Sequence, residues 1–318
     1  MASDNHTPGS WIFSRDILAW LKQEKLVKQL PIHYQDFALQ CNNYFEKNNN
    51  LKIENGSQSF QNLINRYRLK DSPKEIQIQL PTCKVFVNLE DPRFFQVINE
   101  LTCEENDKKI IRRLLKEGDS FFDIGANHGS FSILAGQVLG DSGKILAVEA
   151  QPRLATLVKK SLAANLTCNF QVHQVALGDR HGEIEFMIPV DSSGSAGVFA
   201  GHSATHDFQK LTVTLKPFDD LICADDFKPR GLMKLDIEGS EYFFLKGAEQ
   251  TIRQLQPTIF LEINPGTLQA SGVKIEQLKD LLIDYGYGSY AEVDNLEAQS
   301  SLTVLAADYQ RNIVVFPS

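Results

Sequence analysis

The sequence predicts an α/β protein, in which helices cover both faces of a mostly parallel sheet. From residue 106 onward, short apolar runs alternate with helical patterns, which is the rhythm of a parallel sheet. The apolar run at Phe121 ends in an acid and then in two glycines four residues apart, a layout typical of strand, tight turn and helix. A second buried-looking run, 144–149, also ends in an acid.

The remaining elements follow from periodicity and from glycine and proline positions. Helices are predicted over 107–117, 130–139, 153–165, 240–254 and 273–285. Strands are predicted to end at Asp123 and Glu149, and to cover 169–177, 182–188, 211–215, 232–237, 258–263, 287–293, 302–306 and 313–316. The polar segment 191–209 lies between two of these strands.

Residues 1–105 have a different pattern from residues 106–318, so we divide the chain between them. Apolar residues at helical spacing predict an amphipathic helix over 10–30 that Pro31 stops. Alternation in 76–80 and 85–87 predicts a hairpin. The first region is therefore expected to be an α-rich accessory part that acts as a lid, a dimer contact or a docking contact.

Composition limits the class of protein. The chain has 318 residues, 42% of them hydrophobic, which suffices for one large core with or without a smaller one. A net charge of −8 without a basic run argues against nucleic acid as a partner. Five cysteines without a C-x-x-C pair indicate reduced thiols, and no apolar stretch is long enough to cross a bilayer, so we expect a cytoplasmic protein without a membrane partner.

The first acid-and-glycine motif predicts a nucleoside cofactor. Gly125 and Gly129 leave room for a ligand near the backbone, and Asp123 is a fixed acceptor or counter-charge. Glu149 at the tip of the second strand is placed to accept ribose hydroxyls. The bend lacks the middle glycine of a dinucleotide site, which disfavours the alternative of an NAD(P)-dependent oxidoreductase and favours a phosphate-free cofactor such as S-adenosylmethionine.

Further acids are predicted to meet at the same sheet edge. Asp236 and Glu238 are two residues apart and would share a face at a strand end, with Glu262 beside them on the next strand. Together with Asp123 and Glu149 they give a negative rim that suits a sulfonium. Crowded carboxylates raise one another's pKa, which prepares one as a general base for an alcohol proton.

Three alternatives stay open at this rim. The acids at 236, 238 and 262 are also suitable ligands for a divalent ion such as Mg²⁺. Glu238 or Glu241 has the alternative role of capping the following helix. His128 and His202 are alternative bases, although His128 is equally suited to be a packed turn residue.

Four segments together resemble the FkbM-type family of S-adenosylmethionine-dependent methyltransferases. They read DIGANHG at 123–129, VEAQP at 148–152, VALGD at 175–179 with Gly182, and KLDIEGSE at 234–241 with Pro257 and Glu262 downstream. They span about two thirds of the chain, and residues 1–105 lie outside them. The chain departs from the family's usual Phe-Glu-Pro by reading Val-Glu-Ala at 148–150, which keeps the acid but loses the aromatic neighbour.

The resemblance implies a class I methyltransferase (Rossmann-like) domain with seven strands, the last of them antiparallel. It implies methyl transfer to a hydroxyl of a sugar, polyketide or similar natural product. The residues expected to line the methionine part, the ribose and the adenine are Asp123, Gly125, Ala126, Asn127, Gly129, Asp236, Glu149, Ala176 and Leu177. We further expect a small hydroxylated acceptor, either free or bound to a carrier protein, and a homodimer as one option. A non-catalytic cofactor-binding or docking module is the remaining alternative.

Overall fold

The computed structural model describes residues 75–88, 91, 93, 97–98, 100–101, 106–189, 196–199 and 208–318. The chain divides into two compact units, Met1–Cys103 and Glu104–Ser318. In the first unit, β1 (Glu75–Gln79) and β2 (Lys84–Asn88) pair antiparallel, which confirms the predicted hairpin. The predicted helix over 10–30 lies outside the described residues.

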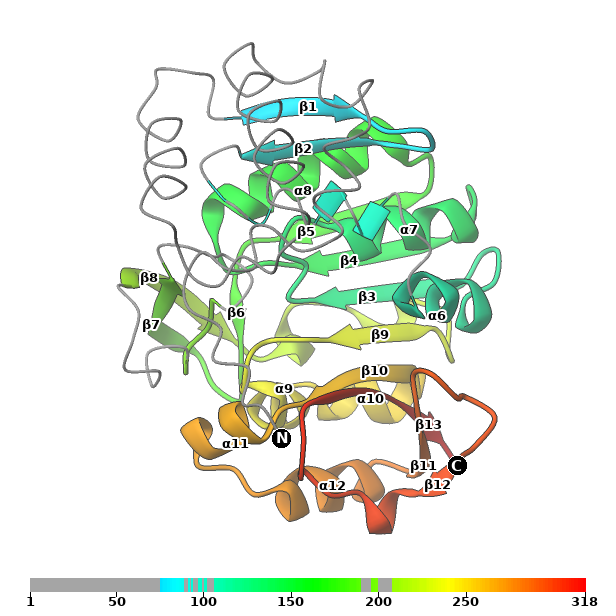
Figure 1. The fold of residues 1–318 in the computed structure, drawn as a ribbon, viewed down its shortest axis with the longest axis vertical. Coiled ribbons are helices and arrows are strands. Elements are labelled where there is room, and N and C mark those ends of the chain that lie inside the picture. Colours follow the sequence, from blue (N-terminus) through cyan, green and yellow to red (C-terminus); the bar gives the residue numbers. More distant parts are fainter. Residues whose placement is uncertain are drawn as a thin grey trace, which may run out of the picture. The chain divides into compact units, whose positions relative to one another are not determined.

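The second unit is built on an eight-stranded sheet in the order β12-β11-β13-β10-β9-β3-β4-β5 (Figure 1). Its strands are β3 (Ser120–Ile124), β4 (Lys144–Val148), β5 (Asn169–His173), β9 (Leu232–Leu235), β10 (Thr258–Ile263), β11 (Tyr287–Glu292), β12 (Ser300–Ser301) and β13 (Arg311–Pro317). Strands β5, β4, β3, β9 and β10 run parallel, whereas β13 runs antiparallel between β10 and β11. The antiparallel last strand is as expected, and the short β12 adds an eighth strand to the predicted seven.

Helices cover both faces of this sheet (Figure 1). On one face, α6 (Asn106–Leu114), α7 (Ser130–Leu139) and α8 (Pro152–Asn165) contact one another. The other face carries α9 (Glu241–Gly247), α10 (Glu249–Leu255) and α12 (Ile275–Asp284), and α11 (Pro265–Ser271) follows β10. Within the described residues, no helix combines the length and apolar character that crossing a membrane requires.

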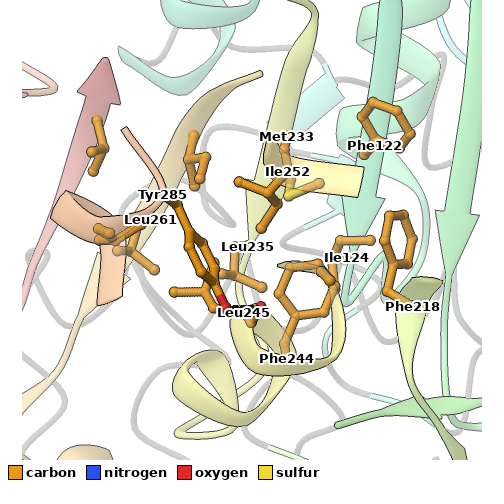
Figure 2. Packing of buried hydrophobic residues seen from close by; sticks show 14 of the residues in the cluster. Phe122, Ile124, Phe218, Met233, Leu235, Phe244, Leu245, Ile252, Leu261 and Tyr285 are labelled. Carbon is orange, nitrogen blue, oxygen red and sulfur yellow. Dashed lines mark hydrogen bonds between the residues drawn. The ribbon is translucent and has the colours of Figure 1, made fainter. Parts of the chain in front are cut away.

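The two faces are filled differently because side chains alternate along a strand. Phe122, Ile124, Met233 and Leu235 point to the α9–α12 side, where they join a large buried cluster with Phe244 (Figure 2). Burying a side chain of this size contributes about 1.5–3 kcal/mol. The intervening positions, Asp123 on β3 and Lys234 on β9, are paired in register and face α7 instead.

A three-stranded sheet in the order β6-β8-β7 corrects the prediction of one strand over 169–177. The strand β5 ends at His173, and β6 (Ala176–Leu177) pairs with β8 (Phe208–Lys216), which in turn pairs with β7 (Gly182–Pro189). The apolar face of β7 and β8 packs against Ala176. The chain therefore leaves the main sheet after β5, and β6 joins a second sheet that has its own apolar face.

Other boundaries also differ from the sequence prediction, most clearly after β9 and near residue 302. The strand predicted over 232–237 ends at Leu235, and the helix predicted over 240–254 is interrupted at Ala248. Next to the interruption, a Cβ on Gly247 would lie 1.9 Å from the carbonyl oxygen of Gly178, so α9 lies directly on the loop after β6. The predicted strand over 302–306 is wrong: Leu302–Val304 is a 3₁₀ helix whose first turn is capped by the Ser301 hydroxyl.

Candidate active site

The bend between β3 and α7 is formed by glycines in left-handed conformations. Gly125 has φ of +81°, and Gly129, which caps α7, has φ of +80°. The N–H groups of Gly125 and Ala126 both donate to the carbonyl of Val148, at 3.0 and 2.9 Å. A Cβ on Gly125 would lie 2.0 Å from the carbonyl oxygen of Asp236, so this bend is closed by direct backbone packing.

Asp123 is fully buried at the base of the bend, and its two carboxylate oxygens differ. Its Oδ2 accepts from the Ser132 N–H at 3.1 Å and from the Ser132 hydroxyl at 2.6 Å, which anchors the first turn of α7. No described residue donates a hydrogen bond to Oδ1, which lies 3.8 Å from the Lys234 ammonium. Burial raises the pKa of this carboxyl, against the opposing effect of Lys234. One buried oxygen of Asp123 therefore accepts no hydrogen bond from the described residues.

Glu149 joins two loops through its carboxylate. Its Oε2 accepts from the Asn127 N–H and its Oε1 from the Gln151 N–H, both at 2.8 Å. Burial raises the pKa of Glu149 to about 7. Each carboxylate oxygen has two acceptor sites, so this arrangement leaves capacity for ribose hydroxyls. Glu149 thus shapes the bend in addition to its expected role toward the ribose.

His128 is placed as a turn residue. Its ring is 1% exposed, and its Nδ1 lies 2.6 Å from the amide oxygen of Asn127. Asn127 itself has φ of +50°. The alternative base His202 lies outside the described residues.

Ala176 and Leu177, the expected adenine neighbours, are both buried in β6. Ala176 packs in a cluster that includes Ala150, the residue after Glu149. Leu177 lines a small cavity of about 70 Å³ together with Ser240 and Phe243 of the α9 end. The two predicted residues therefore connect the end of β4 with the start of α9.

Lys234 is a site residue that the sequence reasoning missed. Its side chain is 6% exposed, and its Nζ lies 3.0 Å from Asp236 Oδ2 and donates to the Gly125 carbonyl at 3.2 Å. The Phe131 ring lies 5.1 Å from the same ammonium. The available signal was a lysine inside an otherwise apolar strand, two residues before an acid, since such a lysine needs a buried partner.

The three acids at 236, 238 and 262 come together. One carboxylate oxygen from each lies within 4.8 Å of the others, and all three residues are half-buried. The predicted reason for this was wrong, because β9 ends at Leu235 and Glu238 has φ of +52°, so a turn and not a shared strand face brings Asp236 and Glu238 together. Burial, and then the charge of Asp236, raise the pKa of Glu262, whose Oε1 accepts from Gln310 at 2.6 Å.

Glu241 has the capping role that the sequence left open. It lies in the first turn of α9, and its Oε1 accepts from the N–H groups of Ile237 and Gly239, both at 3.2 Å. Its side chain is buried, which raises its pKa to about 7. Glu241 thus holds the turn that carries Glu238.

The strand order, the glycine bend and the acid after β4 are features of the class I methyltransferase fold. The residues fit S-adenosylmethionine, because the buried Asp123 and Glu149 carboxylates suit a cationic group and ribose hydroxyls. The expected room beside the glycines is not left for a ligand, since an added Cβ would meet the Asp236 backbone at Gly125 and the Val158 side chain at Gly129. The chain belongs to the FkbM methyltransferase family: residues 123–288, more than half of its length, match the Methyltransferase FkbM domain. This membership favours methyl transfer over the nicotinamide alternative.

Individual relatives are more distant. Ribosomal RNA large subunit methyltransferase E of Sorangium cellulosum is 36% identical over 85 residues, which are 24% of this chain and 39% of that protein. The methyltransferase FkbM structure from Methylobacillus flagellatus aligns with 15% identity and a TM-score of 0.38, over 71% of this chain and 54% of that one. An O-methyltransferase from Bacillus cereus in complex with S-adenosylhomocysteine aligns with 11% identity and a TM-score of 0.40, over 69% and 83%. The chain spans about a quarter to two fifths of the length of the curated relatives it matches.

Proposed function

We propose that this protein transfers the methyl group of S-adenosylmethionine to a hydroxyl oxygen of a small acceptor. The observation that carries the proposal is the cluster of Asp236, Glu238 and Glu262 beside the cofactor bend. Carboxylates are suitable bases for an alcohol proton, and the carboxyl ends of parallel strands are where α/β sheets bind their ligands. The cofactor supplies an activated methyl group when bound, so the protein's tasks are to align the acceptor and to take its proton.

Within the cluster, the acids are suited to different tasks. Asp236 Oδ2 is held by the Lys234 ammonium at 3.0 Å, which favours a positioning role. The raised pKa of Glu262 favours it as the proton acceptor at neutral pH. In the proposed step, the acceptor oxygen bonds to the methyl carbon as the carbon–sulfur bond breaks, and the hydroxyl proton passes to a carboxylate. Glu238 is the second candidate, and His128 is less suited because it is 1% exposed.

A small natural product, such as a sugar or a polyketide, is the acceptor class that we propose. The net charge of −8 disfavours a nucleic acid acceptor. The small cavity next to the turn that carries Glu238 is lined by apolar side chains such as Leu177 and Phe243 together with Ser240, Asp179 and Arg180, which suits an acceptor with both apolar and polar groups. Delivery on a carrier protein stays a secondary proposal.

The direct test is a screen of the purified full chain with labelled S-adenosylmethionine and a panel of hydroxylated sugars and polyketides, with matched amines. Mass spectrometry then locates the methyl group. Glu262→Gln is expected to slow transfer about 10²- to 10⁴-fold while S-adenosylhomocysteine affinity stays within about twofold. The exposed Glu276→Gln is the control, because Glu276 lies in the first turn of α12. A methyl group found on nitrogen or carbon would refute the proposal.

A further inference from the structure

A buried positive charge lies between the cofactor bend and the acidic cluster. The Lys234 ammonium contacts the carbonyl of Gly125 in the bend at 3.2 Å and the carboxylate of Asp236 in the cluster at 3.0 Å. It also lies 3.8 Å from Asp123 Oδ1, which accepts no hydrogen bond from the described residues. This one side chain therefore meets both halves of the site.

We propose that Lys234 sets how strongly the site prefers the positively charged methyl donor over its neutral product, by balancing the charges of Asp123 and Asp236. The inference rests on S-adenosylmethionine being the donor of the proposed reaction. It goes further because it assigns a role to a residue outside the proposed catalytic cluster and concerns donor and product binding, not the transfer step.

Lys234 is 6% and Asp123 0% exposed at the side chain, so their charges are poorly screened by water. Asp123 and Asp236 are two carboxylates that lie against the Lys234 ammonium, whose positive charge opposes theirs. The register of β3 and β9 fixes this geometry, since Asp123 and Lys234 are directly paired.

S-adenosylmethionine and S-adenosylhomocysteine share the adenosine and the amino acid part, and they differ by the methyl group and the positive charge on sulfur. The ratio of the S-adenosylhomocysteine dissociation constant to the S-adenosylmethionine dissociation constant therefore reports the electrostatic field at the sulfur. A change in the contacts that both ligands share affects both constants alike and cancels from this ratio. A unit charge in a partly buried site changes such a ratio roughly 3- to 20-fold at an effective dielectric constant of about 20–40.

The experiment measures both dissociation constants by calorimetry for the full chain and for Lys234→Met, which keeps length and removes charge. We expect preference for S-adenosylmethionine over S-adenosylhomocysteine to rise about 3- to 20-fold in Lys234→Met and to fall in Asp236→Asn. Lys144→Met is the matched control, because Lys144 also donates to a carbonyl, at 2.8 Å, and lies over a phenylalanine ring, but at the start of β4. Its ratio should equal that of the unmodified chain.

Removing one partner of a buried ion pair is destabilising. Lys234→Met is therefore also made in the Asp236→Asn variant, which lacks the Asp236 charge. Adding Lys234→Met to Asp236→Asn should raise the ratio again, toward the value of the unmodified chain. An unchanged or lower ratio in either background overturns the role of Lys234 and leaves the methyltransferase function intact. If the unmodified chain binds neither ligand, the donor assignment itself fails, and the inference falls with it.

Discussion

Gly125 and Asp236 meet through their backbones: a Cβ on Gly125 would lie 2.0 Å from the main-chain oxygen of Asp236. The Asp236 N–H donates to the carbonyl of Ile124, at 3.2 Å. The bend after β3 and the turn after β9 are thus locked together. Since the first holds the cofactor motif and the second begins the acidic cluster, this contact fixes the separation of the two.

Gly125→Ala is therefore expected to abolish cofactor binding. The new methyl group collides with backbone that cannot rotate away, and alanine disfavours φ of +81°. We expect S-adenosylhomocysteine affinity to fall at least about 100-fold by calorimetry and the protein to lose several kcal/mol of stability, about 3 or more, in urea unfolding.

The control for this substitution separates backbone strain from collision. Gly272 has a similar φ of +72°, but nothing lies within 4 Å of its added Cβ. Gly272→Ala should cost only about 1–2 kcal/mol and leave cofactor affinity unchanged. Equal effects of the two substitutions would show that the contact with Asp236 has no special importance.

Glu149→Gln tests the carboxylate that joins the two loops. Its two oxygens accept from two different N–H groups, those of Asn127 and Gln151, and glutamine offers one oxygen and one amide group. One buried N–H would therefore lose its acceptor, at a cost of about 1–3 kcal/mol. We expect S-adenosylhomocysteine affinity to fall at least about tenfold by calorimetry, with Glu276→Gln as the neutral control. Unchanged affinity would remove Glu149 from the binding site.

Glu241→Gln, unlike Glu149→Gln, is expected to leave every one of its N–H donors with an acceptor. A single oxygen of Glu241 accepts from the N–H groups of both Ile237 and Gly239. Glutamine keeps that oxygen and removes the buried charge. The pKa of Glu241 is raised from 4.5 to about 7, so the folded state binds the proton more tightly than the unfolded state. Stability is then greatest below about pH 4.5 and falls as the pH rises toward 7, by on the order of 3 kcal/mol for this group.

The measurement is urea unfolding at several pH values between 4.5 and 8. We expect Glu241→Gln to be as stable as the unmodified chain or more so above pH 7, and its decline between pH 5 and 7 to be shallower. Glu149 contributes a decline in the same range, since its pKa is also raised to about 7, so the slope should be reduced and not removed. A variant that loses stability above pH 7 would contradict this explanation.

The sequence predicted those parts of the site that depend on local signals. The two glycines at 125 and 129 and the acids that end β3 and follow β4 lie where expected, because a tight bend and a strand end each need particular residue types. Lys234 was missed, since its partners are set by the register between β3 and β9, which no local pattern reveals. The close approach of Gly247 to Gly178 is likewise a tertiary contact that no local pattern reveals.

Metal dependence is the last property that the cluster allows us to predict. Asp236, Glu238 and Glu262 offer oxygen ligands of the kind that Mg²⁺ prefers. However, the Lys234 ammonium already pairs with Asp236 at 3.0 Å, and Gln310 donates to Glu262 at 2.6 Å. A divalent ion would have to displace the first contact or bind beside a buried positive charge, which is electrostatically unfavourable.

We therefore expect EDTA to leave methyl transfer and S-adenosylhomocysteine affinity within about twofold of their values without it, and millimolar Mg²⁺ to leave the melting temperature unchanged. The Lys234→Met variant supplies the internal comparison. With the competing ammonium removed, the same three carboxylates should gain affinity for Mg²⁺, seen as a rise in melting temperature on adding the ion. Loss of transfer in EDTA that Mg²⁺ restores in the unmodified chain would show that the cluster is a metal site, and that the ammonium does not exclude the ion.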